Sequence, residues 1–299
     1  MGSLSYQVKN KLKQMFAYKE SKRNYKLKNN IKLSSIPGKI YSRSTLQNYI
    51  KWGRKYVEWV KENKGNFKNL EDIPLSYAKE YLDYGVNVKG YSVYTTRLQA
   101  SAIAKLYNVP IKSFYKVPSI SGVKITRSRG KSSADAHFSI KNNKTFIDFC
   151  KGTGLRRKEI TALTPAQIIV KDNKVYIDLE SKREYNVQTK GGRPRVVEVL
   201  PEYYSVVIKA KKNAIATDDD KVFPKIPKNA DIHSYRRFYA KTKYQQFLKN
   251  KFGSIKNVPM NYFRRGKNKG KHYNKAALQH VSRNMGHNRL IVVVNSYLD

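Results

Sequence analysis

The chain has 299 residues, enough for two domains of ordinary size. Its 61 lysines and arginines against 21 acidic residues give a formal net charge of +40, a field that favours nucleic acid as a partner over a membrane surface. Cys150 is the single cysteine, which excludes an internal disulfide. The sequence also contains no apolar stretch long enough for a spanning helix or a signal peptide, so we expect a cytoplasmic protein.

The five histidines and the cysteine do not have the spacing of a metal site. Neither C-x-x-C nor H-E-x-x-H occurs in the chain, and these patterns are typical of bound zinc. We therefore expect no metal.

Residues 1–41 are expected to form a basic N-terminal segment. The helical spacing of Val8, Leu12, Met15 and Phe16 indicates one amphipathic helix within it. The breaker IPGK follows and would end that helix.

Residues 42–109 have the pattern of a small all-helical domain. Ser92 is placed to cap the third of its helices, and Pro74 is expected in the first turn of the second. The predicted helices span 42–63, 70–85 and 91–109.

Residues 110–134 are predicted to be a linker, because Pro, Gly, Ser and charged residues follow one another there without a sustained period. Its RSRGK sequence brings together Arg127, Arg129 and Lys131, which would suit a segment that crosses a phosphate backbone. A solvated flexible loop is an equal alternative.

Residues 135–299 combine helices with a small sheet. Asp172-Asn173 and Gly191-Gly192 each lie between two β-rich runs, as in hairpins. The expected fold class is therefore mainly α with a small antiparallel β-sheet, an α+β domain. The predicted helices lie at 137–150, 156–163 and 202–214 and beyond, the extended pairs at 167–181 and 185–200, and a basic interruption at 250–272.

Arg156 and Arg157 stand where the second of these helices would begin, and a positive charge is unfavourable there. They could be solvated side chains of a basic protein. They could also hold an anion, because a helix start offers free N–H donors and the positive end of a dipole. A phosphate would fit the second interpretation.

Five short boxes in order support the phosphate interpretation: TGLRRKEI, TKGGRPRVVEV, HSYRRFYA, MGHNR and NSYL. Together they resemble the catalytic boxes of the tyrosine recombinase (phage integrase) family. The resemblance covers about residues 130–299, and the helical segment 42–109 is similar to the family's core-binding domain, with less specific residues.

The resemblance implies a site-specific recombinase, the integrase of a phage or an integrative conjugative element. Such an enzyme cuts and rejoins double-stranded DNA through a 3′-phosphotyrosine and without a metal. It needs no nucleotide cofactor either, because the bond energy is retained in the intermediate. The resemblance also implies a C-shaped clamp around DNA, a homo-tetramer on two duplexes, accessory DNA-bending proteins and a nucleoid-associated location in a prokaryotic or viral setting.

The resemblance also assigns residues. Arg156 and Arg236 would neutralise the phosphate, since forked guanidiniums fit two oxygens at once. Glu159 would orient Arg156 through an ion pair. Lys190 would be the general acid for the leaving 5′-oxygen, and Tyr297 would be the nucleophile.

Two assignments remain, the residues of the H-x-x-R box and the role of His287. HSYRRFYA supplies both His233 and Arg236, whereas NYFRR offers Arg264 with asparagine in place of histidine. We choose the first, although the interval to His287 is then about twice what the family implies. The basic stretch 251–272 supplies the excess, either as a DNA grip or as a solvated loop. His287 would bond a phosphate oxygen or orient the nucleophile.

Further basic residues are expected to bind DNA. They are Arg43 and Arg97 of the helical domain, Arg127, Arg129 and Lys131 of the linker, and Arg193 and Arg195 after the turn lysine. Arg157 is not at a catalytic position of the family, and we expect it to be solvated or to touch the DNA backbone.

Two other functions remain open. A type IB topoisomerase would share the Arg, Lys, Arg, His and Tyr set, but the TGLRRKEI box and the small helical domain favour the recombinase. A catalytically inactive DNA-binding regulator could use the same scaffold. The complete set ending in Tyr297 argues against it.

Overall fold

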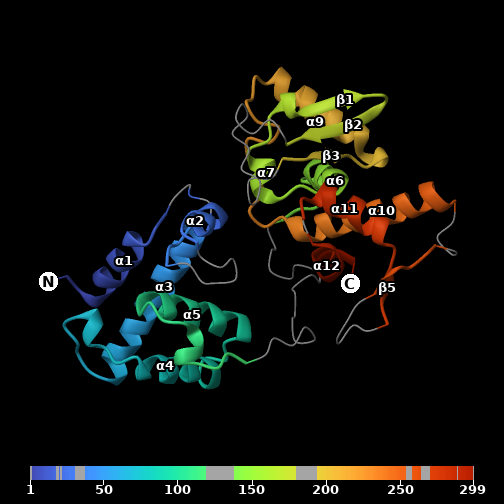
Figure 1. The fold of residues 1–299 in the computed structure, drawn as a ribbon. Coiled ribbons are helices and arrows are strands. Elements are labelled where there is room, and N and C mark those ends of the chain that lie inside the picture. Colours follow the sequence, from blue (N-terminus) through green and yellow to red (C-terminus); the bar gives the residue numbers. More distant parts are fainter. Residues whose placement is uncertain are drawn as a thin grey trace. The chain divides into compact units, whose positions relative to one another are not determined.

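A computed structural model shows the chain as two compact units, Met1–Ile125 and Thr126–Asp299 (Figure 1). Each unit has a hydrophobic core of its own. No helix among the described residues has the length and apolar character that crossing a membrane requires. The structure describes residues 2–17, 20, 22–30, 38–118, 138–179, 194–253, 258–263, 270–287 and 289–298.

The first unit is helical. The oxygen of Ser42 accepts from the backbone N–H of Thr45, and Ser92 caps α5 through Thr95 in the same way. α4 begins after Pro74, which therefore does not lie in its first turn as predicted. The helices are α1 (Leu4–Gln14), α2 (Lys22–Lys28), α3 (Arg43–Asn63), α4 (Ser76–Asn87) and α5 (Val93–Leu106), with 3₁₀ turns η1 (Leu70–Asp72) and η2 (Ile111–Ser113).

α1 belongs to this core, which corrects the separation of residues 1–41 from the helical domain. Val8 and Leu12 are fully buried in the same cluster as the side chains of α3 and α5. A Cβ atom at Gly53 would lie 2.8 Å from Val8, so glycine allows α1 to approach α3 closely. The start of the predicted linker also packs here, through Phe114 and its neighbours.

The second unit combines helices with a three-stranded antiparallel sheet of order β1-β2-β3. Asp172 and Asn173 turn the first hairpin with φ of +50° and +56°, the left-handed pair that a type I′ turn needs. The hairpin predicted at Asp172-Asn173 and the fold class are confirmed, and the predicted Gly191-Gly192 turn lies outside the described residues. The elements are α6 (Lys144–Thr153), α7 (Arg157–Thr161), η4 (Pro165–Gln167), β1 (Ile168–Lys171), β2 (Lys174–Asp178), β3 (Val196–Glu198), η5 (Pro201–Tyr203), α9 (Tyr204–Ala216), α10 (Ile232–Phe252), β4 (Tyr262–Phe263), β5 (His272–Tyr273), α11 (Lys275–Met285), α12 (Leu290–Val293) and the π-helical η7 (Val294–Leu298).

β4 and β5 form a short antiparallel ribbon within the stretch predicted as a basic interruption. The hydroxyl of Tyr244 on α10 accepts from the backbone N–H of Asn274 at 2.8 Å, and the Asn274 side chain donates to the carbonyl of Pro259. These bonds join the ribbon to α10 and to the start of α11.

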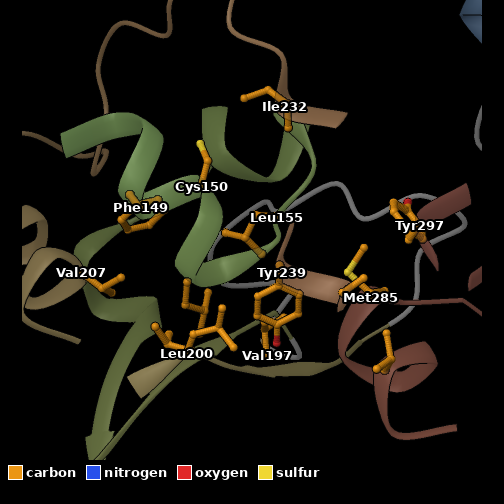
Figure 2. Close-up of a cluster of buried hydrophobic side chains, with 14 of the residues drawn as sticks. Phe149, Cys150, Leu155, Val197, Leu200, Val207, Ile232, Tyr239, Met285 and Tyr297 are labelled. Atoms are coloured by element: carbon orange, nitrogen blue, oxygen red, sulfur yellow. The ribbon is translucent and has the colours of Figure 1, made fainter. Parts of the chain in front are cut away.

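The core of the second unit gathers side chains from both the helices and the sheet, and Figure 2 shows part of it, with Tyr297 among its members. Cys150 is fully buried there, and burial raises the pKa of its thiol. Tyr297, near the end of the chain, is therefore held by the same core that carries the sheet.

Candidate active site

The loop between α6 and α7 places Arg156. α6 ends at Gly154, whose φ of +58° is left-handed, a conformation that glycine adopts without strain. Arg156 then has an extended conformation and stands just before α7, and its backbone N–H donates to Oε2 of Glu159 at 2.8 Å. α7 has five residues rather than the eight predicted. Because the dipole of so short a helix is small, positive charge at this site comes mainly from the arginine side chains.

Glu159 is the buried centre of this region. Its carboxylate is fully buried and accepts from Nη1 of Arg156 at 2.8 Å, and from Nη1 and Nη2 of Arg195 at 3.0 and 2.7 Å. Burial alone would raise the pKa of Glu159, but the hydrogen bonds and charge of Arg195, followed by those of Arg156, lower it to about 2. Glu159 is therefore ionised at neutral pH.

The C-terminus of α11 completes the setting of both arginines. Nη2 of Arg156 donates to the carbonyls of Met285 and Gly286 at 2.9 and 3.2 Å, and Nε of Arg195 donates to the carbonyl of Asn284 at 3.0 Å. The last carbonyls of a helix lack partners inside it and carry its negative end, so they favour guanidinium groups.

Arg236 projects from α10 into the core and is 2 % exposed. It donates to the carbonyls of Gly154 and, at 3.5 Å, Met285, and its Nη2 donates to the hydroxyl of Tyr297 at 3.2 Å. Burial lowers the pKa of this arginine, and Tyr297 partly offsets that effect. The guanidinium thus joins α10 to the end of α6 and to the C-terminal segment.

Tyr297 lies on the π-helical segment η7 and is 4 % exposed. Its hydroxyl also lies 3.2 Å from Nε2 of His287, and the Arg236 guanidinium lies 5.6 Å from the centre of its ring. Ser282 fixes the backbone of His287, since its hydroxyl donates to the carbonyl of His287 and its own carbonyl accepts from the His287 N–H. π-Helical turns are frequent at functional sites.

Solved structures of XerH, a site-specific recombinase, share this arrangement of elements. The post-cleavage complex with palindromic difH substrate aligns at a TM-score of 0.55 and 15 % identity, over 98 % of this chain and 90 % of that chain. The pre-cleavage complex with difH gives 0.52 and 14 % over the same shares. The chain has the fold of these XerH structures. No family model and no curated protein matches the sequence.

On this recombinase fold the structure brings together five of the predicted site residues. Arg156 and Glu159 form one group, Arg236, His287 and Tyr297 form a second, and both groups hydrogen-bond the carbonyl of Met285. His233 lies one turn before Arg236 on α10 and is exposed.

The other predicted residues lie elsewhere on the recombinase fold or outside the described part. Arg43 and Arg97 are exposed on α3 and α5 of the first unit. Within the described residues no group of His, Cys, Asp and Glu gathers that could hold a metal ion. The predicted residues that lie outside the described ones are Lys190, Arg127, Arg129, Lys131, Arg193 and the rejected alternative Arg264.

Arg195 corrects one prediction. We expected it to contact DNA, but it is 7 % exposed, and its donors bind Glu159 and the carbonyl of Asn284. The sequence carried a signal for this position. Arg195 alternates with the buried Val197 and Val199, and a period of two places all three on the inner side of the sheet.

Arg157 is half-buried and hydrogen-bonded to the protein backbone, whereas we expected it to be solvated or to touch the DNA backbone. Its guanidinium donates to the carbonyls of Pro227 and Ala230 at 2.8 Å and of Lys228 at 3.1 Å. These residues directly precede α10, so Arg157 ties the start of α10 to α7. Arg156 and Arg157 therefore have different partners, and Arg157 binds carbonyl groups of the protein backbone.

Sequence reasoning missed a supporting pair behind the site, Tyr239 and Asn284. The fully buried Tyr239 donates to the carbonyl of Glu198 at 2.7 Å and to Oδ1 of Asn284 at 3.2 Å. Its ring packs against Gly154, where a Cβ atom would lie 2.5 Å away. Nothing in the local sequence distinguishes this tyrosine from the other tyrosines of the chain.

Proposed function

We propose that the chain is a site-specific DNA recombinase that breaks and rejoins DNA strands through a covalent 3′-phosphotyrosine. The observation that carries this proposal is the setting of Tyr297. Its hydroxyl lies 3.2 Å from Arg236 Nη2 and 3.2 Å from His287 Nε2, in a chain with a net charge of +40 and the fold described above.

The proposed reaction is a phosphoryl transfer. The oxygen of Tyr297 forms a bond to the phosphorus as the bond from phosphorus to the 5′-oxygen breaks. The phenolic proton passes to His287, whose Nε2 is within hydrogen-bond reach in the neutral tautomer that leaves this nitrogen unprotonated. Lys190 donates a proton to the departing 5′-oxygen. Attack by another 5′-hydroxyl reverses the steps and reseals the strand.

The arginines would stabilise the transition state, where negative charge grows on the non-bridging oxygens. Arg156 is partly exposed, with 19 % of its side chain accessible, and can meet a phosphate directly. One donor of Arg236 is bonded to Tyr297 instead. An entering phosphate would replace that hydrogen bond and free the hydroxyl for attack.

We extend the proposal to the assembly. Four copies on two duplexes, with accessory DNA-bending proteins, would integrate or excise a mobile element, and both units would contact the recombination site. Two observations support DNA as the partner. The charge excess is spread along the whole chain, and the similar XerH structures are complexes with difH substrate.

The proposal is tested with a nicked suicide substrate made from the DNA flanking the chain's own gene. Wild-type protein should form a covalent adduct in EDTA without nucleotide, because no step above uses either. Tyr297→Phe should bind the DNA and form none, whereas Tyr176→Phe, a matched change on β2, should react normally. A strict need for Mg²⁺, or an adduct with the Tyr297→Phe variant, would contradict the proposal.

A further inference from the structure

Glu159 has a fully occupied carboxylate. Each of its oxygens accepts two hydrogen bonds, one from Arg195 and one from Arg156, which contributes its side chain to Oε1 and its backbone N–H to Oε2. An ionised carboxylate has about four acceptor sites. Arg195 occupies two of them in a bidentate pair, the strongest geometry between these groups.

Arg195 directs its bonded donors into the protein. Its third contact is the carbonyl of Asn284, and the side chain is 7 % exposed. A Cβ atom at Gly286 would lie 2.9 Å from Nη1 of Arg195 and 3.2 Å from Nη1 of Arg156. Both guanidiniums therefore occupy the space where a side chain at Gly286 would lie. The carboxylate of Glu159 bonds both Arg156 and Arg195 and so separates their positive charges.

Removing Arg195 would change the partners of Arg156. Two acceptor sites of a buried carboxylate would be empty, which is unfavourable. Arg156 already donates to Oε1 at 2.8 Å, so its guanidinium can fill them. It would turn into a bidentate pair with Glu159 and lose donors that a phosphate needs.

We infer that Arg195 is a positioning residue, which occupies Glu159 and so leaves Arg156 available to the scissile phosphate. The inference rests on the proposed function, because it concerns the residue assigned there to phosphate. In this role Arg195 would touch neither DNA nor the reacting atoms, since its bonded donors face Glu159 and the carbonyl of Asn284. It acts through Glu159, whose charge it balances inside the protein.

The first test compares single and double variants at saturating protein on the suicide substrate. Arg195→Met should slow adduct formation by about 30-fold or more, since the loss of one preorganised donor to the phosphate costs about 10²–10³-fold. The double variant Arg195→Met with Glu159→Gln should form the adduct at least about tenfold faster than Arg195→Met alone, because the carboxylate that captures Arg156 is gone. A purely structural role predicts a double variant no faster than Arg195→Met, and that result would overturn the inference.

The second test is the pH profile. Among the described residues, the charged groups that face Glu159 are Arg156, Arg195 and Arg236. Without Arg195 the pKa of Glu159 rises, so acid protonates it in the variant and releases Arg156. The ratio of the Arg195→Met rate to the wild-type rate should therefore rise as pH falls from about 8 to about 5. A flat ratio would contradict the inference.

Controls separate the possible failures. Arg283→Met, an exposed arginine on α11, should react like the wild type. If Arg195→Met does not fold, Arg195→Lys with and without Glu159→Gln gives the same comparison, and lysine should be intermediate because it makes one point contact. A wild-type rate for folded Arg195→Met overturns this inference and leaves the proposed function standing. A wild-type protein without any adduct overturns both.

Discussion

Arg236 is the side chain through which three parts of the second unit meet. It bonds the carbonyl at the end of α6, the carbonyl of Met285 at the end of α11, and the hydroxyl of Tyr297. A buried guanidinium without these partners would be strongly unfavourable. The contacts that keep Arg236 stable in the core therefore also fix the distance between its guanidinium and the hydroxyl of Tyr297.

The choice of Arg236 over Arg264 gives a direct prediction. Arg236→Lys keeps a charge but loses the fork, and adduct formation should fall by about 10²-fold or more, as expected for a lost preorganised donor. Arg264→Lys should react normally. Rates on the suicide substrate decide between them, and an essential Arg264 with a dispensable Arg236 would show that the H-x-x-R box was assigned wrongly.

Glu159 predicts how stability depends on pH. Its pKa is lowered to about 2 in the folded protein, below the value near 4.3 of an unfolded chain. The lowered pKa of Glu159 therefore contributes about 3 kcal/mol to the free energy of unfolding. This contribution is fully present above about pH 5 and is lost as pH falls toward 2. The difference in free energy of unfolding between wild type and Glu159→Gln should shrink over this range. A constant difference would contradict the pairing.

At the scale of elements, the position of α10 depends on Arg157. Arg157→Ala removes three hydrogen bonds to the segment before the helix. About 1–3 kcal/mol of stability should be lost, because two of these bonds are partly buried and their carbonyls lose their partner. Hydrogen exchange should increase at the first turn of α10, and adduct formation should slow. Lys158→Ala, an exposed neighbour, is the control. Unchanged exchange at α10 would contradict the anchoring role.

Local chemistry explains which elements were predictable. α3 and α5 begin where Ser42 and Ser92 cap them, and Asp172-Asn173 turns the hairpin through its own backbone preference. Each signal lies within a few residues of the structure it specifies. The order of the boxes added Arg156, Arg236, His287 and Tyr297, which the structure brings together.

The remaining features depend on contacts distant in sequence. The buried pair of Arg195 with Glu159 joins residues 36 positions apart, and the anchor of Arg157 reaches 70 to 73 positions along the chain. Charge on a basic chain gives no indication of such burial. α1 likewise contributes Val8 and Leu12 to a core built by later helices, so the segment 1–41 could not be assigned from its own composition.

At the scale of the whole molecule, a net charge of +40 predicts binding dominated by phosphate neutralisation. The logarithm of the association constant should fall with the logarithm of salt at about −0.9 per phosphate contacted, and about six or more contacts would give a slope near −5 or steeper. Arg97→Gln on the exposed face of α5 should reduce the slope by about 0.9. The buried Arg195 should not affect it, and a slope shallower than about −2 would contradict the prediction.

The central claim is that the hydroxyl held by Arg236 and His287 becomes covalently joined to DNA. Mass spectrometry of the trapped adduct, after nuclease and protease digestion, tests it most directly. We expect a nucleotide phosphate on the peptide that contains Tyr297, joined through its phenolic oxygen. A phosphate on any other tyrosine, or on a serine, would contradict it.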